Sequence, residues 1–378
     1  MDKDLLEKLT SDGIELLKNL IKTPSVSRNE DKTAELIFNY LKNHGVENIN
    51  RHLNNVWALS KNFDANKPTI LFNSHHDTVL PAKTYTRDPF SPDVENGVLY
   101  GLGSNDAGGP AINLLTNFLY FYNKEIPYNL IVAITAEEEN SGENGVMSIL
   151  DKLPEIEFAV VGEPTCMEIS VAEKGILVLD CTAKGKTGHA ARNTGVNAIY
   201  KAMEDINWLK NYQFEKISPW LGSVKCTVTG VNAGTLHNVI PAECTFMVDV
   251  RITEKYTHQE VLDIIRNNIP NKDTEVKPRS FKLKSSHIDE NHPFIKLASE
   301  KGFKLFGSPT TSDRAVMPYA SLKMGPGDSN RSHTADEYIL ISEITEGVMK
   351  TAALFEDYFT TFPLRRSSKT SSGASSEV

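Results

Sequence analysis

The chain has 378 residues, which is more than one hydrophobic core usually organises, so we expect two domains. Its apolar fraction of 40% and charged fraction of 24% are typical of a globular protein and speak against disorder. The formal net charge of −9 speaks against a nucleic-acid groove or an anionic membrane surface, because both would need a basic field.

The sequence predicts neither a membrane span nor a secretion signal. No apolar run is long enough to cross a bilayer, and the N-terminal run MDKDLLEKLTSDG lacks the apolar stretch of a signal peptide. The cysteines form no CxxC pair, so a zinc–thiolate site has no spacing to support it. We therefore expect a cytoplasmic protein with reduced thiols at Cys166, Cys181, Cys226 and Cys244.

The first segment of the chain predicts two helices. An apolar stripe at helical spacing runs from Leu5 to Leu20 and ends before Pro24. Residues 30–43 repeat the helical period, and Gly45 follows them as a stop signal.

Buried parallel strands are predicted next. Three short apolar runs follow, with a helical segment near 110–123 between the first two of them. Runs this apolar indicate parallel strands that helices cover on both faces. They lie at residues 69–72, 130–134 and 158–161.

The pattern changes near Glu173, where a second domain is predicted. A strand, a helix, two strands, a helix and a strand follow in this order, which is the ferredoxin-like arrangement. We expect these elements at residues 174–183, 197–210, 223–231, 242–252, 257–268 and 274–282.

The α/β pattern then returns, with helices at 293–301 and 341–358 and a strand at 321–324. We therefore predict an α/β domain with a mostly parallel mixed sheet flanked by helices. Residues 1–173 and 286–362 form it, and an α+β domain at 174–285 is inserted between them. The serine-rich tail at 363–378 has almost no apolar residues and is expected to be disordered.

The chemistry begins with the run SHHDTV, which follows the apolar run TILFN. In an extended chain His75 and Asp77 share a face and His76 points the other way. An imidazole beside a carboxylate suits a metal ligand that a neighbouring acid orients. From this motif alone, a buried histidine satisfied by an aspartate is an equally good interpretation.

Four further groups carry acidic or imidazole side chains near the ends of apolar runs. Asp106 lies in a glycine-rich turn before a helix, where a capping role is the alternative. Three consecutive carboxylates, from Glu137 to Glu139, repel one another unless a cation is present or the loop is solvated. Glu163 directly follows an apolar run, and His333 lies in GPGDSNRSHTADEY. Each signal is weak alone, but together the groups indicate a metal site at the carboxyl ends of the strands.

These motifs resemble those of the dinuclear-zinc metallopeptidase and deacylase family that includes acetylornithine deacetylase, succinyl-diaminopimelate desuccinylase, aminoacylase and carboxypeptidase G. The resemblance extends from the first helix to about residue 360 and is closest to the acetylornithine deacetylase type. It implies a zinc-peptidase-like catalytic domain and makes the inserted domain a dimerisation or lid domain.

The resemblance also implies a role for each acidic motif. His75 and Glu163 would bind the first zinc ion, Glu139 and His333 the second, and Asp106 both. Asp77 would orient His75, and Glu138 would be the general base. The cofactors are then two Zn²⁺ ions, for which Co²⁺ or Mn²⁺ are substitutes. One histidine and one acid per ion, with the shared aspartate, leave room for a bridging water.

Further residues are implied for the substrate and for the partner subunit of a homodimer. His189, in GKTGHAARNTGVNAI, would reach the active site of the other subunit, whereas an exposed loop histidine is the alternative. Asn238, in LHNVIPAE, would lie near the substrate of that same site. Arg251 suits a bidentate clamp on a carboxylate, with a structural salt bridge as the alternative, and Thr311 would contact the substrate too.

The sequence departs from the family pattern at three points. Glu137 stands where the family often has Asp, the run after His189 lacks the expected proline, and no lysine follows Asp106 closely. None of these departures removes a ligand, so they bear on the substrate. The resemblance implies removal of an N-acetyl or N-succinyl group from ornithine, citrulline or a related amino acid, in arginine biosynthesis. The alternatives are a dipeptidase or general aminoacylase, and a catalytically inactive scaffold that would have lost the base or a ligand.

Overall fold

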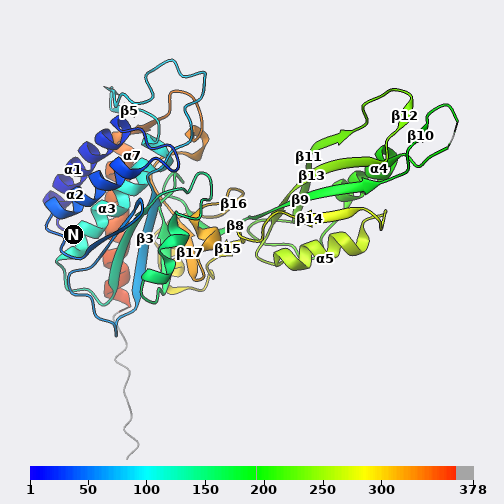
Figure 1. Cartoon of the computed structure of the whole chain (residues 1–378). Helices are drawn as coiled ribbons and strands as arrows, with labels where there is room; N and C mark the ends of the chain where they lie inside the picture. The colour runs from blue at the N-terminus through cyan, green and yellow to red at the C-terminus, as the bar shows by residue number, and fades with distance from the viewer. Residues whose placement is uncertain (193, 363–378) are drawn as a thin grey trace, which may run out of the picture.

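The computed structural model of the chain describes residues 1–192 and 194–362. Figure 1 shows a larger body, which contains both ends of the described chain, and a smaller lobe that extends from it. The tail predicted to be disordered, residues 363–378, lies outside the described residues. Within those residues, no helix combines the length and the apolar character that a membrane crossing requires.

A nine-stranded mixed sheet forms the centre of the larger body. Its main path has the order β1-β2-β6-β3-β7-β17-β8-β15, and β16 pairs with β8 beside this path. The central strands β6, β3, β7 and β17 are parallel to one another, which confirms the predicted arrangement. The bounds are β1 (Ile49–His52), β2 (Asn55–Leu59), β3 (Thr69–His75), β6 (Asn129–Thr135), β7 (Phe158–Val161), β8 (Ile169–Glu173), β15 (Ser286–His287), β16 (Leu305–Ser308) and β17 (Ala320–Lys323).

Among the described residues, helices cover one face of this sheet, so the predicted helical cover of both faces was wrong. Every residue of α3 (Gly109–Tyr122) is buried, because α3 packs against β3 on one side and against α1 (Lys3–Lys22) and α7 (Ile341–Thr361) on others. The remaining helices of the body are α2 (Asp31–Asn43) and α6 (Pro293–Glu300). Ile70 and Phe72 of β3 point into this helical core, whereas Leu71 points to the other face. There, short 3₁₀ turns at η2 (Val146–Ser148) and η3 (Leu150–Lys152) lie in the segment that covers the sheet.

The smaller lobe has the predicted β-α-β-β-α-β order. Its antiparallel sheet has the strand order β11-β13-β9-β14. Burial alternates along the ten residues of β9, since one face packs against the two helices and the other faces solvent. The bounds are β9 (Gly175–Lys184), α4 (Ala198–Asn211), β11 (Lys225–Ala233), β13 (Glu243–Ile252), α5 (His258–Asn268) and β14 (Glu275–Pro278).

Two neighbouring chain segments connect the lobe to the body. The outgoing segment leaves β8 at Glu173, and the returning segment forms β15, where Ser286 pairs with Glu173. Gly175 is needed here, because a Cβ atom at this position would lie 2.4 Å from the backbone nitrogen of Ser285. The Glu173 carboxylate is buried and lies 2.7 Å from the ammonium nitrogen of Lys323. We call these paired segments, 173–175 and 285–287, the neck.

A small three-stranded sheet, which the sequence analysis did not predict, lies beside the carboxyl ends of the central strands. It consists of β4 (Val94–Glu95), β5 (Val98–Tyr100) and β18 (Tyr338–Leu340). Tyr338 pairs with Tyr100, which places the segment that carries His333 next to the turn that carries Asp106. This sheet therefore brings the last predicted ligand to the others.

Candidate metal centre

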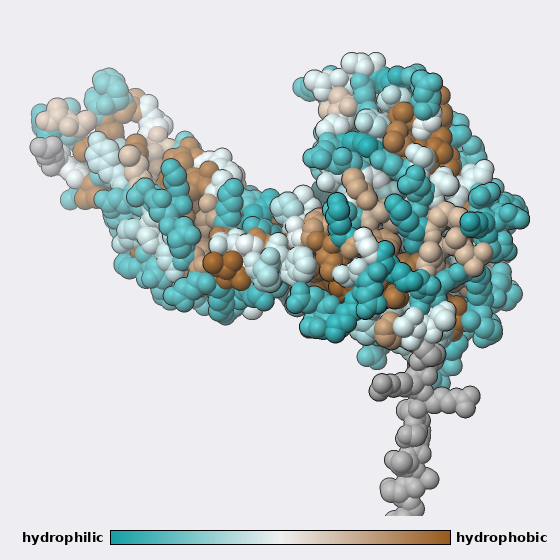
Figure 2. All heavy atoms as spheres, turned by 180° about the vertical axis from the view of Figure 1, so that it is seen from behind, coloured by the Kyte–Doolittle hydropathy of each residue, from teal (hydrophilic) through white to brown (hydrophobic). Residues whose placement is uncertain are grey.

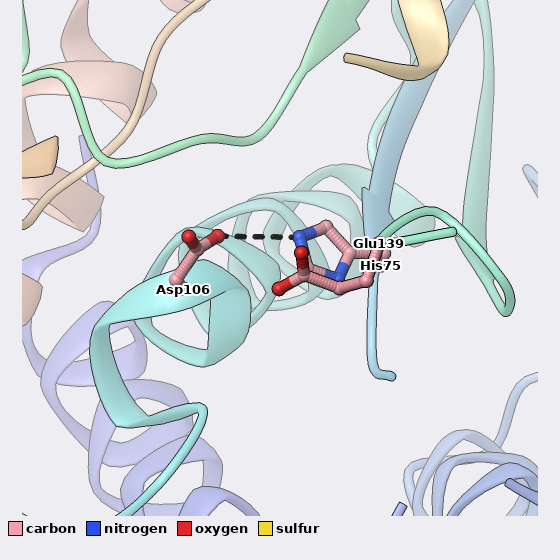
Figure 3. A group of neighbouring side chains, drawn as sticks. All are labelled: His75, Asp106 and Glu139. Atoms are coloured by element: carbon pink, nitrogen blue, oxygen red, sulfur yellow. Dashed lines mark ion pairs between the residues drawn. The ribbon is translucent and has the colours of Figure 1, made fainter. Parts of the chain in front are cut away.

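The predicted ligands from the central strands meet at one edge of the sheet. His75 is the last residue of β3, Glu139 lies in the loop after β6, and Glu163 follows β7. Because β6, β3 and β7 are adjacent and parallel, their carboxyl ends lie side by side. Figure 3 shows His75, Glu139 and Asp106 directed toward one common point.

Asp106 lies between two histidine–carboxylate pairs. Its Oδ1 atom is 3.3 Å from His75 Nε2, and its Oδ2 atom is 3.7 Å from His333 Nε2. His75 Nε2 is also 3.9 Å from Glu163 Oε1. His333 Nε2 is 2.9 Å from Glu139 Oε2 on the other side. The two oxygens of one carboxylate thus face two separate sets of donor atoms.

These donors fit a pair of zinc ions. Two donor atoms that each lie roughly 2.1 Å from one tetrahedral zinc ion are about 3.4 Å apart, close to the separations above. One donor atom each from His75, Asp106 and Glu139 lies within 4.8 Å of the others. The charges fit as well, because carboxylates outnumber imidazoles here. Burial and the neighbouring Asp106 raise the pKa of Glu163 to about 8, as expected where anions crowd without a cation.

The two halves of the centre differ in exposure. The side chain of His75 is 2% exposed, whereas that of His333 is 55% exposed. The hydrogen bond to the Glu139 carboxylate raises the pKa of His333 to about 9. The His75 half therefore lies inside the body and the His333 half opens to solvent.

Asp77 holds the acidic loop through backbone hydrogen bonds. Its Oδ1 accepts from the amide nitrogen of Glu138 at 3.0 Å, and its Oδ2 accepts from that of Glu139 at 3.2 Å. Ser27 Oγ donates a third hydrogen bond at 2.7 Å. Nδ1 of His75 lies 3.0 Å from the backbone oxygen of Asp77 and 3.5 Å from its Oδ1. One aspartate therefore orients both His75, a predicted metal ligand, and the loop that follows β6.

His76 points away from the centre, as its alternation with His75 predicts. Its Nδ1 lies 2.9 Å from Thr33 Oγ1 and its Nε2 lies 2.9 Å from the backbone oxygen of Asn54. Burial lowers the pKa of His76 to about 4, which keeps this imidazole neutral. His76 is therefore a structural histidine.

The surroundings of Glu138 favour the protonated form of its side chain, as expected of a general base. It lies 4.0 Å from His75 Nε2, measured to its Oε2 atom. Burial and the carboxylates of Glu163 and Asp313 hold its pKa well above the ordinary range. A small cavity beside it is lined by Glu138, Thr311 and Asp313, among others. Thr311 Oγ1 donates to the backbone oxygen of Lys174 at 3.0 Å on the rim of this cavity.

Two acids near the centre were missed in the sequence. Asp313 is buried, accepts a hydrogen bond from Thr135 Oγ1 at 2.8 Å and has its pKa raised to about 6 by burial. It lies in the run TTSDR, from which only Thr311 was selected. Glu337 is buried too, and it follows His333 closely in HTADEY. The only feature of the sequence that pointed to either acid was its position close to a predicted site residue, Thr311 for Asp313 and His333 for Glu337.

His189 and Asn238 are not brought to the metal centre of their own chain. His189 is exposed in β10 (Gly188–His189), which pairs with β12 (Val239–Ile240), and the amide of Ala190 donates to the backbone oxygen of Asn238 at 3.0 Å. Figure 1 shows both strands at the end of the lobe that is remote from β3. The structure thus brings these two residues together, but far from the metal ligands.

Arg251 forms an ion pair inside the lobe. Its Nε and Nη2 atoms donate to the two oxygens of Asp249 at 2.8 and 3.1 Å. The Arg251 side chain is 34% exposed, and Lys225 is its neighbour on β11. The structural salt bridge that the sequence analysis gave as the alternative role of Arg251 is therefore present within the chain.

Comparisons with known proteins agree with this architecture. Residues 171–277 match the peptidase dimerisation domain of the M20 family. The succinyl-diaminopimelate desuccinylase of Wolbachia pipientis wMel is 28% identical over 262 residues, which are 65% of this chain and 66% of that protein. The acetylornithine deacetylase of Buchnera aphidicola subsp. Schizaphis graminum is 28% identical over 356 residues, which are 86% of this chain and 92% of that protein.

A solved structure shares the fold. The YXEP protein of Bacillus subtilis, a dinuclear metal binding peptidase from the M20 family, superposes with a TM-score of 0.72 at 20% identity. The match covers 94% of this chain and 99% of that one. The chain therefore has the peptidase fold of the M20 metallopeptidases, with a segment inserted into it that matches their dimerisation domain, and it is similar in sequence to hydrolases that remove N-acyl groups.

Proposed function

We propose that this chain is a dinuclear-zinc amidohydrolase that removes an N-acetyl or N-succinyl group from ornithine, citrulline or a related amino acid. The observation that carries the proposal is the position of Asp106, whose two oxygens face His75 and His333 at 3.3 and 3.7 Å. His75 and Glu163 would hold one ion, His333 and Glu139 the other, and Asp106 both. Co²⁺ or Mn²⁺ would substitute for Zn²⁺, since the donors are imidazoles and carboxylates.

The catalytic roles follow from the surroundings of each side chain. Two divalent ions, when bound, would lower the pKa of a shared water and polarise the amide carbonyl. Glu138 takes a proton from the attacking water and returns it to the leaving amine, because its raised pKa suits both transfers. Asp77 keeps Glu138 in place through the backbone of the acidic loop.

The enzyme acts as a homodimer in this proposal. The dimerisation domain and the remote position of His189 and Asn238 support it, because these two residues lie far from the metal centre of their own chain and at the outer end of the lobe. His189 would donate a hydrogen bond to the developing oxyanion, and Asn238 would bind the substrate. Arg251, released from Asp249, would bind the substrate carboxylate with Thr311 nearby.

The names of the curated relatives, a deacetylase and a desuccinylase, support an N-acyl amino acid as substrate. By the same resemblance we place the enzyme in the cytoplasm and in arginine biosynthesis. A dipeptidase or general aminoacylase is the second candidate, because peptidases of this fold have the same architecture.

A substrate panel with the purified, zinc-loaded full chain tests the proposal. We expect kcat/KM to be highest for one of the N-acetyl or N-succinyl derivatives of ornithine or citrulline, at least tenfold above simple dipeptides. The Glu138→Gln variant, prepared in parallel, shows how much activity comes from contaminating hydrolases. Preference for dipeptides would establish the second candidate, and a wild-type protein that binds no zinc would overturn both.

A further inference from the structure

Three backbone amides of the turn that carries Asp106 point at a single buried carboxylate. Glu337 Oε1 accepts hydrogen bonds from the amides of Asn105 and Asp106, both at 2.9 Å. Glu337 Oε2 accepts one from the amide of Gly103 at 3.0 Å. Glu337 is only 2% exposed, so all of these hydrogen bonds are shielded from water. We call residues 103–106 the Asp106 turn.

The turn needs these acceptors because its backbone is not helical at Asp106. Asp106 has φ −117° and ψ 99°, so the amides around it cannot all bond within a helix. Gly103 has φ +76°, a conformation that favours glycine, and a Cβ atom there would lie 2.6 Å from Thr78 Cγ2. Successive amides that converge in this way form a concave site for an anion. Glu337 fills that site from a segment more than two hundred residues away in the sequence.

The small sheet fixes Glu337 in this position. β18 begins at Tyr338, which pairs with Tyr100 of β5, and the amide of Gly101 donates to the backbone oxygen of Glu337 at 3.0 Å. Both the backbone and the side chain of Glu337 therefore bind the segment at 101–106. Both side-chain oxygens of Glu337 accept backbone hydrogen bonds, so its carboxyl group serves as an acceptor for the turn.

We infer that Glu337 is the positioning residue of the metal centre, since it holds Asp106 where its carboxylate can bridge two ions. This inference rests on the proposed function. Without the three acceptor bonds the turn would have several backbone conformations, and the Asp106 oxygens would face His75 and His333 only part of the time.

Glu337→Gln tests this inference with little change in shape. The amide oxygen still accepts two of the backbone hydrogen bonds, but its NH₂ group then faces an N–H donor. We expect the affinity of the full-length apo chain for zinc to fall about 10- to 100-fold, as for other residues that orient a ligand. Both ions should be affected, because Asp106 belongs to both sites. The readout is a zinc titration in competition with a chromophoric chelator, which needs no turnover.

Asp205→Asn is the matched control. Asp205 is a buried carboxylate of the lobe that accepts hydrogen bonds from the amide of Asn271 at 3.0 Å and from Thr274 Oγ1 at 2.6 Å. Its replacement should lower the melting temperature of the apo chain and leave zinc affinity unchanged. A purely structural Glu337 would behave like this control and would overturn the inference.

Glu337→Asp covers the case in which Glu337→Gln does not fold. The charge is kept but the side chain is one methylene shorter, so it cannot reach all three amides. We expect zinc affinity between those of wild type and Glu337→Gln, and wild-type affinity for both ions would contradict the inference. A wild-type chain that binds no zinc would instead overturn the proposed function on which the inference rests.

Discussion

The Asp77 carboxylate contacts Glu138 through the backbone amide of Glu138, 3.0 Å away, and leaves the Glu138 side chain free. The same carboxylate accepts from the amide of Glu139. A candidate base and a candidate ligand on one loop are thus held by a residue at the end of the neighbouring strand. The position of both side chains is set by the backbone that carries them.

Asp77→Ala should therefore weaken metal binding although Asp77 is not itself a ligand. We expect a loss of about 10- to 100-fold in zinc affinity, because the loop loses its acceptors and His75 its orientation. Titration of the apo protein with zinc measures this loss of affinity. Ser27→Ala, which removes only one of the hydrogen bonds to Asp77, serves as the control and should have a smaller effect. Equal affinity of Asp77→Ala and wild type would show that the loop holds its position unaided.

Glu138→Gln should retain two zinc ions per chain and lose turnover. General-base catalysis typically contributes about 10²- to 10⁴-fold, and kcat should fall by that factor because the amide cannot accept the proton. Metal analysis of the purified variant, together with its kcat, checks both halves of the statement. Loss of a zinc ion in Glu138→Gln would mean that Glu138 is a ligand.

His333→Ala should bind one ion tightly and the other weakly. The half of the centre with His75 and Glu163 keeps its donors, whereas Glu139 loses the imidazole 2.9 Å away. Zinc stoichiometry after dialysis is the measurement. Two tightly bound ions in this variant would remove His333 from the ligand set.

His189 and Glu138 should complement each other between subunits. In an equal mixture of His189→Ala and Glu138→Gln protomers, half of the dimers are mixed and each mixed dimer has one intact site. Activity should return to about a quarter of the wild-type value once subunits have exchanged. An inactive mixture in which exchange has been verified would place His189 outside the site of the partner subunit.

The buried ion pair at the neck should respond to pH with a definite sign. Burial alone would raise the pKa of Glu173, but Lys323 and Arg314 outweigh it and hold the pKa below the ordinary value. The carboxylate therefore stabilises the fold above its unfolded pKa, about 4.3, and this contribution is lost as the pH falls through the folded pKa.

Lys323→Met tests that ion pair. It leaves a buried carboxylate without its closest cation, so the free energy of unfolding at pH 7 should fall by about 3–5 kcal/mol. The deficit should shrink as the pH is lowered, because protonated Glu173 needs no partner. Urea unfolding of the apo chain at several pH values measures the trend. Lys304→Met, which breaks the exposed pair with Glu168, should cost less than about 1 kcal/mol at every pH.

Elements with a long, regular pattern could be predicted from the sequence. The parallel strands β3, β6 and β7 are buried throughout and contain short apolar runs, whereas buried residues alternate with less buried ones along β9 and β13, so both patterns were recognisable. The strands β4, β5 and β18 have two or three residues each, which is too few for any periodicity. β4 and β5 form a hairpin around the Asn96–Gly97 turn, whereas β18 joins it from a distant segment of the chain.

The same limit applies to the site. His75, Asp106 and Glu163 stand next to strand ends or glycine turns, which are local signals. Glu337 bonds to amides more than two hundred residues away, and an amide acceptor has no sequence signature of its own. For Arg251 the sequence left a structural salt bridge open without a partner, and the structure identifies that partner as Asp249, on the same face of the strand.

The neck has a consequence for the history of the chain. Because Ser286 pairs with Glu173, the lobe leaves and re-enters the body at neighbouring positions of one sheet. A short turn between these two residues would close the chain without breaking any strand of the nine-stranded sheet, and closing so small a gap costs little entropy. The lobe is therefore a cassette that a chain of this fold can acquire or lose in one piece, while the edge of the sheet that carries His75 and Glu163 stays as it is.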